Sequence, residues 1–402
     1  MLGSIWAYYE LGWGGFWFWD PVENVSLMPW LALTTLLHCV LVLEKRSALS
    51  SWVIILSITT FTLSMCGTFL VRSGILNSVH TFASDPQRGL FILTFLFVLI
   101  SISLFIFFVF HKNSQQNSIL FSLVSKETSI LINNWLMMYF LSVVLIGTVY
   151  PIFLQVISTE QISVGPPFYH KLIVPFLIPF LIFMAIGPKL NWIKSEIKKK
   201  KNLVILFVIS ILISYLILKN LSANFLVNTI LIGSAFYLFF VTSREFFSKR
   251  FQNVSQNLSH FGFSLLILSI LFNSIFSQEL IVNLKVGEKF NNDEFQIEFI
   301  DLKKFKKQNF TSFKGIFLIT DQGNKSEFNP ELRVYNQPNI ITSEADIKTT
   351  FWTDRFITMN TLQNEEYFNI RYQVKPFMLW IWISVLLISL GGTISLFNRK
   401  YR

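Results

Sequence analysis

The sequence predicts an all-α polytopic membrane bundle of about nine transmembrane helices, with a small β-rich extramembrane domain between the last two spans. The first observation is composition: of 402 residues, 52% are hydrophobic and only 14% are charged, and the mean hydropathy is +0.53. Soluble globular chains carry about 25% charged residues. The second and third observations are nine long apolar stretches and one charged stretch near the C-terminus. A soluble cytosolic enzyme is therefore excluded.

The apolar stretches define the spans. A bilayer core of roughly 30 Å requires about 20 apolar residues in a helix. The first stretch is short, and the interfacial ring of Trp30 extends its reach. The nine predicted spans are residues 28–43, 52–71, 89–110, 135–154, 172–188, 203–219, 225–243, 260–277 and 377–397.

Lysine and arginine are distributed unequally between the two sets of loops. One set holds sixteen: Lys45, Arg46, Lys112, Lys126, Lys189, Lys194, Lys198, Lys199, Lys200, Lys201, Arg244, Lys249, Arg250, Arg399, Lys400 and Arg402. The other set holds four: Arg72, Arg88, Lys171 and Lys219. The positive-inside rule then predicts an N-terminus outside and a C-terminus inside. It also explains the net charge of +10, so no nucleic-acid partner is expected.

The charged stretch, residues 279–375, holds 13 basic and 14 acidic residues. Short alternating segments at Phe295–Ile300 and Gly315–Thr320, with a turn at Asp321–Gly323, predict strands. We therefore expect four parts. These are a tryptophan-rich outer segment (1–28), a bundle of eight helices (29–278), an outer β-rich domain (279–375), and a final helix with a short inner tail (376–402).

Aromatic residues crowd positions 6–30. The five tryptophans are Trp6, Trp13, Trp17, Trp19 and Trp30. An interfacial anchoring belt or helix packing is the more common explanation, although a belt needs fewer aromatic residues. A flat apolar partner such as a porphyrin would also suit this surface. Asp20 and Glu23 resemble paired catalytic carboxylates. With Pro21 between them, however, they fit better as a capping box that starts a helix.

This segment resembles the tryptophan-rich "WWD" signature of heme-handling membrane proteins, and most of all the CcmF-type cytochrome c maturation proteins. Further similar stretches are TFLVRSGILNSVHTFASDPQRG at 68–89, GPPFY at 165–169 and KPFMLWIWISVLLISLGGTISLFNRKYR at 375–402. The resemblance covers essentially the whole chain in the family's order. Phe16 and Ile5 depart from it, because the family commonly has Trp at these positions.

The resemblance implies a heme lyase that joins heme vinyl groups to the two thiols of a CxxCH motif in apocytochrome c, on the outer face of the membrane. It implies a heme chaperone and apocytochrome-delivering maturation subunits as partners. The membrane would be the bacterial inner (cytoplasmic) membrane or the mitochondrial inner membrane, with the β-rich domain in the periplasm or the intermembrane space. Catalytic residues stay unassigned. Positioning is the main contribution of such a site, and we expect Trp13, Trp17, Trp19 and Asp20 to provide it.

The resemblance also assigns histidines. It implies that His80, in the outer loop 72–88, is an axial ligand to the outer substrate heme. Arg72 and Arg88 flank that loop, where they either pair with heme propionates or anchor helix ends. Together with Trp6, Trp13, Trp17, Trp19 and Trp30 they complete the expected outer heme site.

His38 and His260 lie inside predicted spans, both toward the inner leaflet. Two histidines at similar depth on different helices can ligate one heme iron, or they can hydrogen-bond between helices. The resemblance implies the first: a resident b-type heme. His111 is interpreted as interfacial, and His170 is assigned no role.

The resemblance also implies a second outer histidine upstream of the signature, which this sequence does not contain. We expect the chain to be either a fragment or one half of a split protein whose other half is a separate polypeptide. A heme exporter or heme-chaperone-loading protein of the same WWD family is the alternative function. A solute transporter would place acidic residues at mid-membrane, but the predicted spans contain no Asp or Glu. A purely structural scaffold would leave His38 and His260 unexplained.

Overall fold

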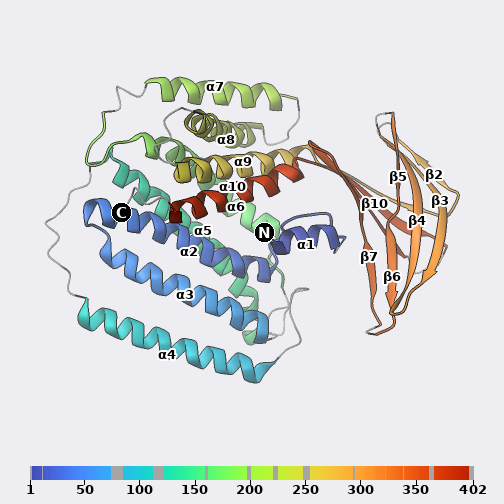
Figure 1. Ribbon diagram of the computed structural model, residues 1–402, viewed down its shortest axis with the longest axis horizontal. Helices are drawn as coiled ribbons and strands as arrows, with labels where there is room; N and C mark the ends of the chain where they lie inside the picture. The colour runs from blue at the N-terminus through green and yellow to red at the C-terminus, as the bar shows by residue number, and fades with distance from the viewer. Residues whose placement is uncertain are drawn as a thin grey trace. The chain divides into compact units, whose positions relative to one another are not determined.

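A computed structural model describes the chain over residues 2–10, 12–73, 85–111, 122–158, 162–196, 201–220, 225–247, 254–292, 295–321, 323–337, 339–361 and 366–397. Within these residues the helices are α1 (Leu2–Glu10), α2 (Pro21–Arg46), α3 (Ser50–Ser73), α4 (Pro86–Phe110), α5 (Lys126–Ile157), α6 (Pro166–Ile186), η1 (Gly187–Lys189), α7 (Lys201–Leu218), α8 (Phe225–Phe246), α9 (Val254–Phe276) and α10 (Met378–Phe397). Figure 1 shows their arrangement.

All nine predicted spans are confirmed: in the described residues, α2 to α10 are long and apolar enough to cross a membrane. The protein is a multi-pass membrane protein. The predicted span 28–43 lies within α2, which has 26 residues and begins at the predicted capping box. Its N-cap is Asp20, and proline at the first helical position has its φ already set for a helix. The nine-residue helix α1 was not predicted.

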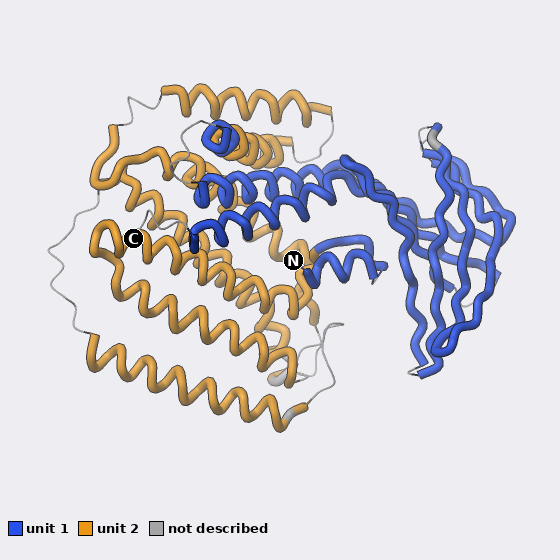
Figure 2. The backbone as a smooth tube through the Cα atoms, in the orientation of Figure 1, with its two compact units in different colours: residues 1–16, 242–402 blue, residues 17–241 orange. Residues whose placement is uncertain are grey.

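The chain divides into two compact units, residues 17–241 and residues 1–16 with 242–402 (Figure 2). In the first unit, α2 packs against α3 and α5, α3 packs against α4, and α5 packs against α6 (Figure 1). At the ends of these helices, the buried carboxylate of Glu127 lies 2.8 Å from Nε of Arg46 and accepts hydrogen bonds from the Ile193 N–H. This contact joins the end of α2, the start of α5 and the segment after α6.

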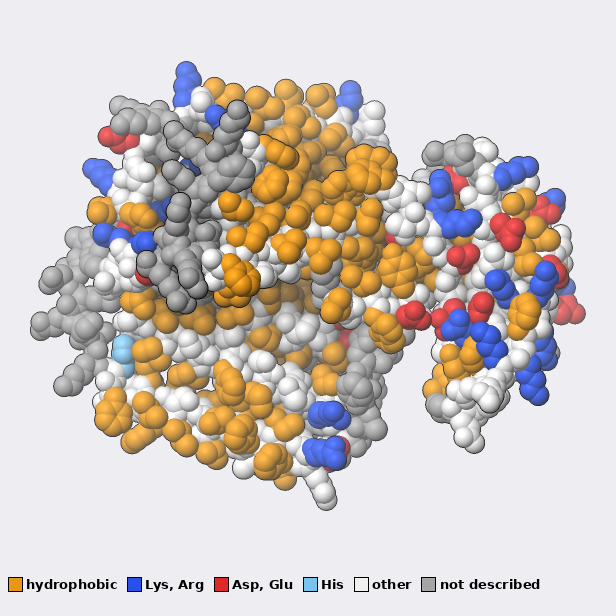
Figure 3. Space-filling view, viewed as in Figure 1, with side chains coloured by type: hydrophobic (Ala, Val, Ile, Leu, Met, Phe, Trp, Pro, Cys, Tyr) orange, Lys and Arg blue, Asp and Glu red, His pale blue; other side chains and the backbone are white. Residues whose placement is uncertain are grey.

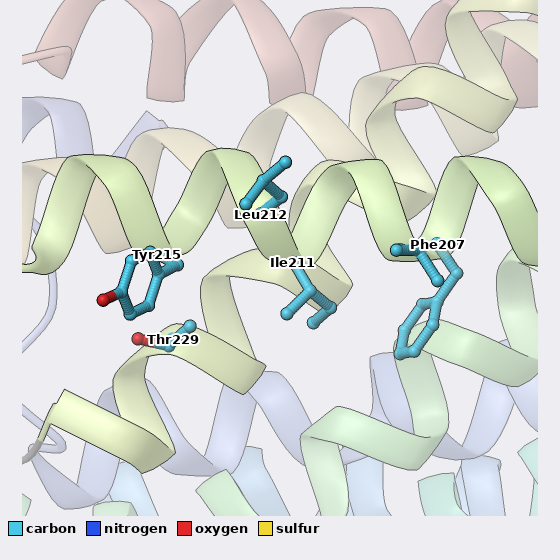
Figure 4. Close-up of a pocket in the computed structure, with 6 residues that line it drawn as sticks. Phe207, Ile211, Leu212, Tyr215 and Thr229 are labelled. Carbon is cyan, nitrogen blue, oxygen red and sulfur yellow. The ribbon is translucent and has the colours of Figure 1, made fainter.

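An open groove of about 540 Å³ lies between α7 and α8 (Figure 4). Its lining is Phe207, Val208, Ile211, Leu212, Tyr215 and Thr229. These side chains are almost entirely apolar, and both helices are candidate spans. The lining thus contains no carboxylate, histidine or cysteine, and its polar groups are the hydroxyls of Tyr215 and Thr229.

The second unit contains α1, α9, α10 and the β-rich domain. Helices α9 and α10 approach closely, because a Cβ on Gly262 would lie 2.9 Å from the Ser384 carbonyl oxygen. The Ser255 hydroxyl also donates to the Gly391 carbonyl at 2.7 Å. Small residues that allow such close contact are typical of helix pairs in membranes.

The β-rich domain is a sandwich between α9 and α10, as predicted. Its strands are β1 (Gln278–Leu284), β2 (Lys289–Asn291), β3 (Phe295–Lys306), β4 (Phe310–Asp321), β5 (Asn324–Phe328), β6 (Glu331–Tyr335), β7 (Ile341–Glu344), β8 (Asp346–Thr349), β9 (Thr353–Thr361) and β10 (Phe368–Pro376). One antiparallel sheet has the order β1-β10-β9-β8. The other has the order β2-β3-β4-β6-β7, with β5 also paired to β4.

The sandwich core joins the two sheets through rings and aliphatic chains. Phe299 stacks on Phe317 with centroids 4.3 Å apart, and Ile297, Ile357 and Ile370 are fully buried beside them. The predicted strands at 295–300 and 315–320 are confirmed within β3 and β4. Lysine, arginine and carboxylate side chains gather on the surface of the sandwich, whereas hydrophobic side chains cover the helices (Figure 3).

Candidate functional site

Asp20 and Glu23 form the capping box at the start of α2. One Asp20 carboxylate oxygen accepts from the Val22 N–H at 2.9 Å. One oxygen of Glu23 accepts from the N–H groups of Phe18 (2.8 Å) and Asp20 (3.2 Å). The structural interpretation of this pair is confirmed. Both carboxylates hold backbone donors, so they fix where the tryptophan-rich segment enters the helix.

Trp19, immediately before this cap, has a left-handed backbone with φ of +58°. That conformation costs a bulky residue on the order of 1–3 kcal/mol and persists only when its surroundings hold it. Two contacts hold Trp19 in this conformation. The Asn24 amide donates to the Trp19 carbonyl at 3.0 Å, and the Tyr169 ring stacks on the Trp19 indole with centroids 4.2 Å apart and an interplanar angle of 7°.

Tyr169 is the tyrosine of the GPPFY sequence, which starts α6. Gly165 is the N-cap, Pro166 follows it, and Tyr169 is buried in the first turns. Its hydroxyl accepts a 2.9 Å hydrogen bond from the fully buried amide of Asn24. The GPPFY sequence predicted no role for Tyr169, and no sequence pattern marked Asn24. Only the fold brings these residues to Trp19.

Two further side chains lie beside this stack. Trp17 meets Trp19 edge to face at 6.2 Å, and the exposed His170 meets it at 6.3 Å and 75°. Trp17, Trp19 and Tyr169 thus form a rigid aromatic group at the start of α2 and α6. Trp30, predicted to belong to the same surface, lies farther along α2 and is partly exposed.

The first part of the tryptophan-rich segment packs on the β-sandwich. Tyr8 of α1 is fully buried, and its hydroxyl donates to Asp354 of β9 at 3.1 Å. Its ring lies against Phe356 (5.8 Å) and against Trp382 of α10 (6.1 Å). No sequence pattern marked Tyr8 or Asp354, because the two residues are 346 positions apart.

The loop after α1 follows the surface of the sandwich. Gly12 and Gly14 both have positive φ, at 65° and 70°. A Cβ on Gly12 would lie 2.6 Å from the Ser343 carbonyl oxygen, and one on Gly14 would overlap the Gln373 side chain. Arg371 of β10 donates to the Trp13 carbonyl at 3.3 Å. Glycine is therefore required at both positions, and the sandwich fixes the backbone around Trp13.

Burial raises the pKa of Asp354 to about 6, while its hydrogen bonds from Tyr8 and Thr349 act in the opposite direction. Burial and the Asp354 charge likewise raise the pKa of Tyr8. The Tyr8 phenol therefore stays protonated, and it is the donor to Asp354 throughout the physiological range.

This raised pKa predicts a pH-dependent contribution to stability. The folded chain keeps a proton on Asp354 at pH values where the unfolded chain, with its usual value of 3.8, has lost it. The contribution is complete below about pH 4 and is lost as the pH rises through about 6. We expect the melting temperature of the wild type to fall relative to Asp354→Asn over this window. Thermal unfolding of the detergent-solubilised chain at constant ionic strength measures this, and parallel profiles would contradict it.

The other residues expected at the outer heme site lie on several different elements. Trp6 is exposed on α1, and Trp13 is half-buried in the loop that follows it. Arg72 ends α3, and Arg88 lies in the first turn of α4, with its Nε 3.1 Å from Asp85. His80 lies outside the described residues, so its assignment stays a prediction.

His38 fits an axial heme ligand by its hydrogen bonding. Its Nδ1 lies 2.9 Å from the Thr34 carbonyl oxygen. A carbonyl only accepts, so Nδ1 carries the hydrogen and Nε2 keeps its lone pair. A hydrogen bond of this kind from the ring nitrogen that does not bind the metal orients metal-binding histidines in general. His38 also lies six residues before Glu44, or about 9 Å along α2.

His260 occupies a comparable place on its own helix. The prediction that His260 starts its span was wrong, because α9 begins at Val254. His260 therefore lies six residues inside, again about 9 Å along the helix. It is half-buried beside Ser259, whose hydroxyl donates to the Ile388 carbonyl of α10. His38 belongs to the first compact unit and His260 to the second.

Comparison with known proteins agrees with this architecture. Residues 1–76 match a family model described as "Cytochrome C assembly protein", and residues 275–376 match "CcmF C-terminal beta-sandwich". The whole chain aligns with "Cytochrome c-type biogenesis protein CcmF" of Pseudomonas aeruginosa at 34% identity and of Escherichia coli at 35%.

Over its whole length, the chain is similar to CcmF proteins.

It spans about 63% of the length of the Pseudomonas aeruginosa relative. A solved structure described as "Cytochrome c Heme Lyase CcmF" superimposes on 97% of this chain and 62% of its own, with a TM-score of 0.76 and 22% identity. At that identity the match shows a shared fold. The chain and that structure thus share one fold over the part that the chain covers.

Proposed function

We propose that this chain is part of a heme lyase of c-type cytochrome biogenesis. The single observation that carries the proposal is the alignment of all its residues, from the tryptophan-rich segment to the sandwich, with CcmF proteins. The sandwich match argues against a heme exporter or a chaperone-loading protein, which shares only the tryptophan-rich part. In the reaction, each apocytochrome thiol adds across one heme vinyl group. A C–S bond forms, and the thiol proton goes to the neighbouring vinyl carbon.

The chain's contribution to this reaction is alignment. Two thiols must meet two vinyl groups, and holding reacting groups in place can lower such a barrier by about 7–11 kcal/mol. The stacked Trp19 and Tyr169, with Trp17 against them, give a rigid aromatic surface on which a porphyrin can lie. The Asp20 cap fixes the backbone of that surface. We propose that Trp6 and Trp13, held on the sandwich, and Trp30 also contact the substrate heme.

We propose His80 as the axial ligand of the substrate heme and Arg72 and Arg88 as partners of its propionates. Arg88 already pairs with Asp85, so propionate binding would extend an existing ion pair. The heme would arrive on a heme chaperone, and reduced apocytochrome c would arrive with other maturation subunits. The positive-inside count supports a chemical site on the outer face of a bacterial or mitochondrial inner membrane.

We further propose a resident b-type heme whose iron is ligated by His38 and His260. Support comes from the Nδ1 hydrogen bond of His38 and from the similar distances of both histidines from the predicted inner ends of α2 and α9. The heme would supply electrons that keep the substrate heme ferrous. The chain's residues contribute ligation and a water-poor surrounding.

The test is covalent heme transfer. The chain, purified from its native membrane with the proteins that accompany it, is supplied with heme-loaded chaperone and reduced apocytochrome c. We expect heme that survives denaturing electrophoresis on the CxxCH substrate but not on a matched SxxSH substrate. If heme instead passes from the chain to the chaperone and no thioether forms, the exporter or loading function is correct.

A further inference from the structure

A short turn at the base of the β-sandwich exposes two large aromatic rings. Thr350–Trp352 connects β8 to β9, and the side chains of Phe351 and Trp352 are 54% and 58% exposed. The turn is well ordered by its own bonds, because the Thr350 hydroxyl and N–H both donate to the Thr353 carbonyl, at 2.7 and 3.0 Å. The exposure therefore belongs to a defined structure, and no charged residue lies between positions 349 and 353.

Two hydrogen bonds connect this turn to the start of the membrane-spanning helix α10. The Phe377 N–H donates to the Trp352 carbonyl at 2.7 Å, and the Trp380 indole N–H donates to the Phe351 carbonyl at 3.0 Å. Phe377 precedes α10, and Trp380 lies in its first turn. The turn is thus level with the point where α10 leaves the sandwich.

The rings continue the aromatic surface of the helix ends. Trp352 stacks on Trp380 with centroids 5.9 Å apart, and Phe351 meets Trp380 edge to face at 4.9 Å. Phe377 in turn contacts Phe272 of α9 at 5.2 Å. Tryptophan is enriched at the membrane–water interface, where its apolar ring and polar N–H suit the headgroup level.

We propose that Phe351 and Trp352 insert into the interface between lipid headgroups and acyl chains, and so anchor the β-sandwich to the bilayer surface. The occupant of this surface is lipid, because the rings are continuous with the outer end of a membrane-spanning helix. The sandwich then has a third attachment besides α9 and α10. This attachment limits its tilt, and with it the tilt of α1 and of the loop that carries Trp13.

Spin labels test the proposal on the full chain in phosphatidylcholine nanodiscs, with Cys39 and Cys66 replaced by alanine. A label at Phe351→Cys is compared with one at Val286→Cys, which is similarly exposed at 46%. Val286 follows β1 and lies roughly 33 Å of extended chain from the end of α9. Power saturation compares contact with oxygen, which partitions into lipid, against a water-soluble nickel chelate.

We expect the oxygen-to-nickel contact ratio to be several-fold higher at position 351 than at position 286. Equal ratios would overturn the proposal, because the turn would then be in water. Low contact with both reagents would also overturn it, because a protein partner would then cover the turn.

A second measurement avoids the cysteine substitutions. The fluorescence difference between the wild type and Trp352→Phe isolates one of the chain's 11 tryptophans. Lipids brominated on the acyl chain should quench this difference signal, and an unquenched signal would contradict insertion. Neither measurement depends on heme lyase activity.

Discussion

Replacing either His38 or His260 with alanine is expected to remove the proposed b-type heme, which we expect to copurify with the unaltered chain. Loss of a residue that only hydrogen-bonds to a metal ligand lowers metal affinity ~10- to 100-fold. Loss of an axial ligand itself should lower the affinity for heme at least as much. The reduced b-type absorption bands of the purified protein, normalised to protein content, measure the effect. Each single variant should lose most of the signal, because the remaining histidine cannot hold the iron alone.

Two other histidines provide matched controls. His111 bonds through Nε2 to the Ser51 hydroxyl at 2.9 Å and stacks on Phe107, so its role is structural. His170 is exposed. Substituting either with alanine should leave the b-type spectrum unchanged. If His38→Ala and His260→Ala both retain full heme content, the proposed pair of ligands is wrong.

Deleting the β-sandwich should separate the two proposed heme functions. We expect a chain in which residues 279–375 are replaced by a short Gly-Ser linker to keep its b-type spectrum and to lose cytochrome c assembly. The linker is feasible because Gln278 pairs with Val374, so the strands that lead from α9 and to α10 are neighbours. Assembly is lost because the deletion removes Asp354, the partner of Tyr8, and any surface for apocytochrome or a maturation subunit.

A milder variant controls for damage by the deletion. Arg371→Met removes only the hydrogen bond to the Trp13 carbonyl and the ion pair with Glu279. It should lower the rate of thioether formation while leaving both the fold and the b-type spectrum intact. Disappearance of all heme from a folded deletion variant would contradict this division of labour.

The sequence by itself determined the features that depend on neighbouring residues. Hydropathy over about 20 residues marks a span wherever it occurs, so the nine candidate membrane helices of the described residues were all predicted. The capping box at Asp20 was also predictable, because its donors and acceptors lie within five positions of one another. The apolar stretch alone marks only residues 28–43 of this helix, whereas the capping box marks its start at Pro21.

The tertiary structure alone decided which distant residues meet. Alternation and a turn predicted strands in the sandwich, but only the fold places β1 beside β10. The tryptophan-rich segment looked like one surface in the sequence. In the structure, Tyr8 bonds to Asp354 and Trp19 stacks on Tyr169, so its two parts pack on different elements. Such contacts depend on packing between elements far apart in the chain, and local periodicity carries no information about them.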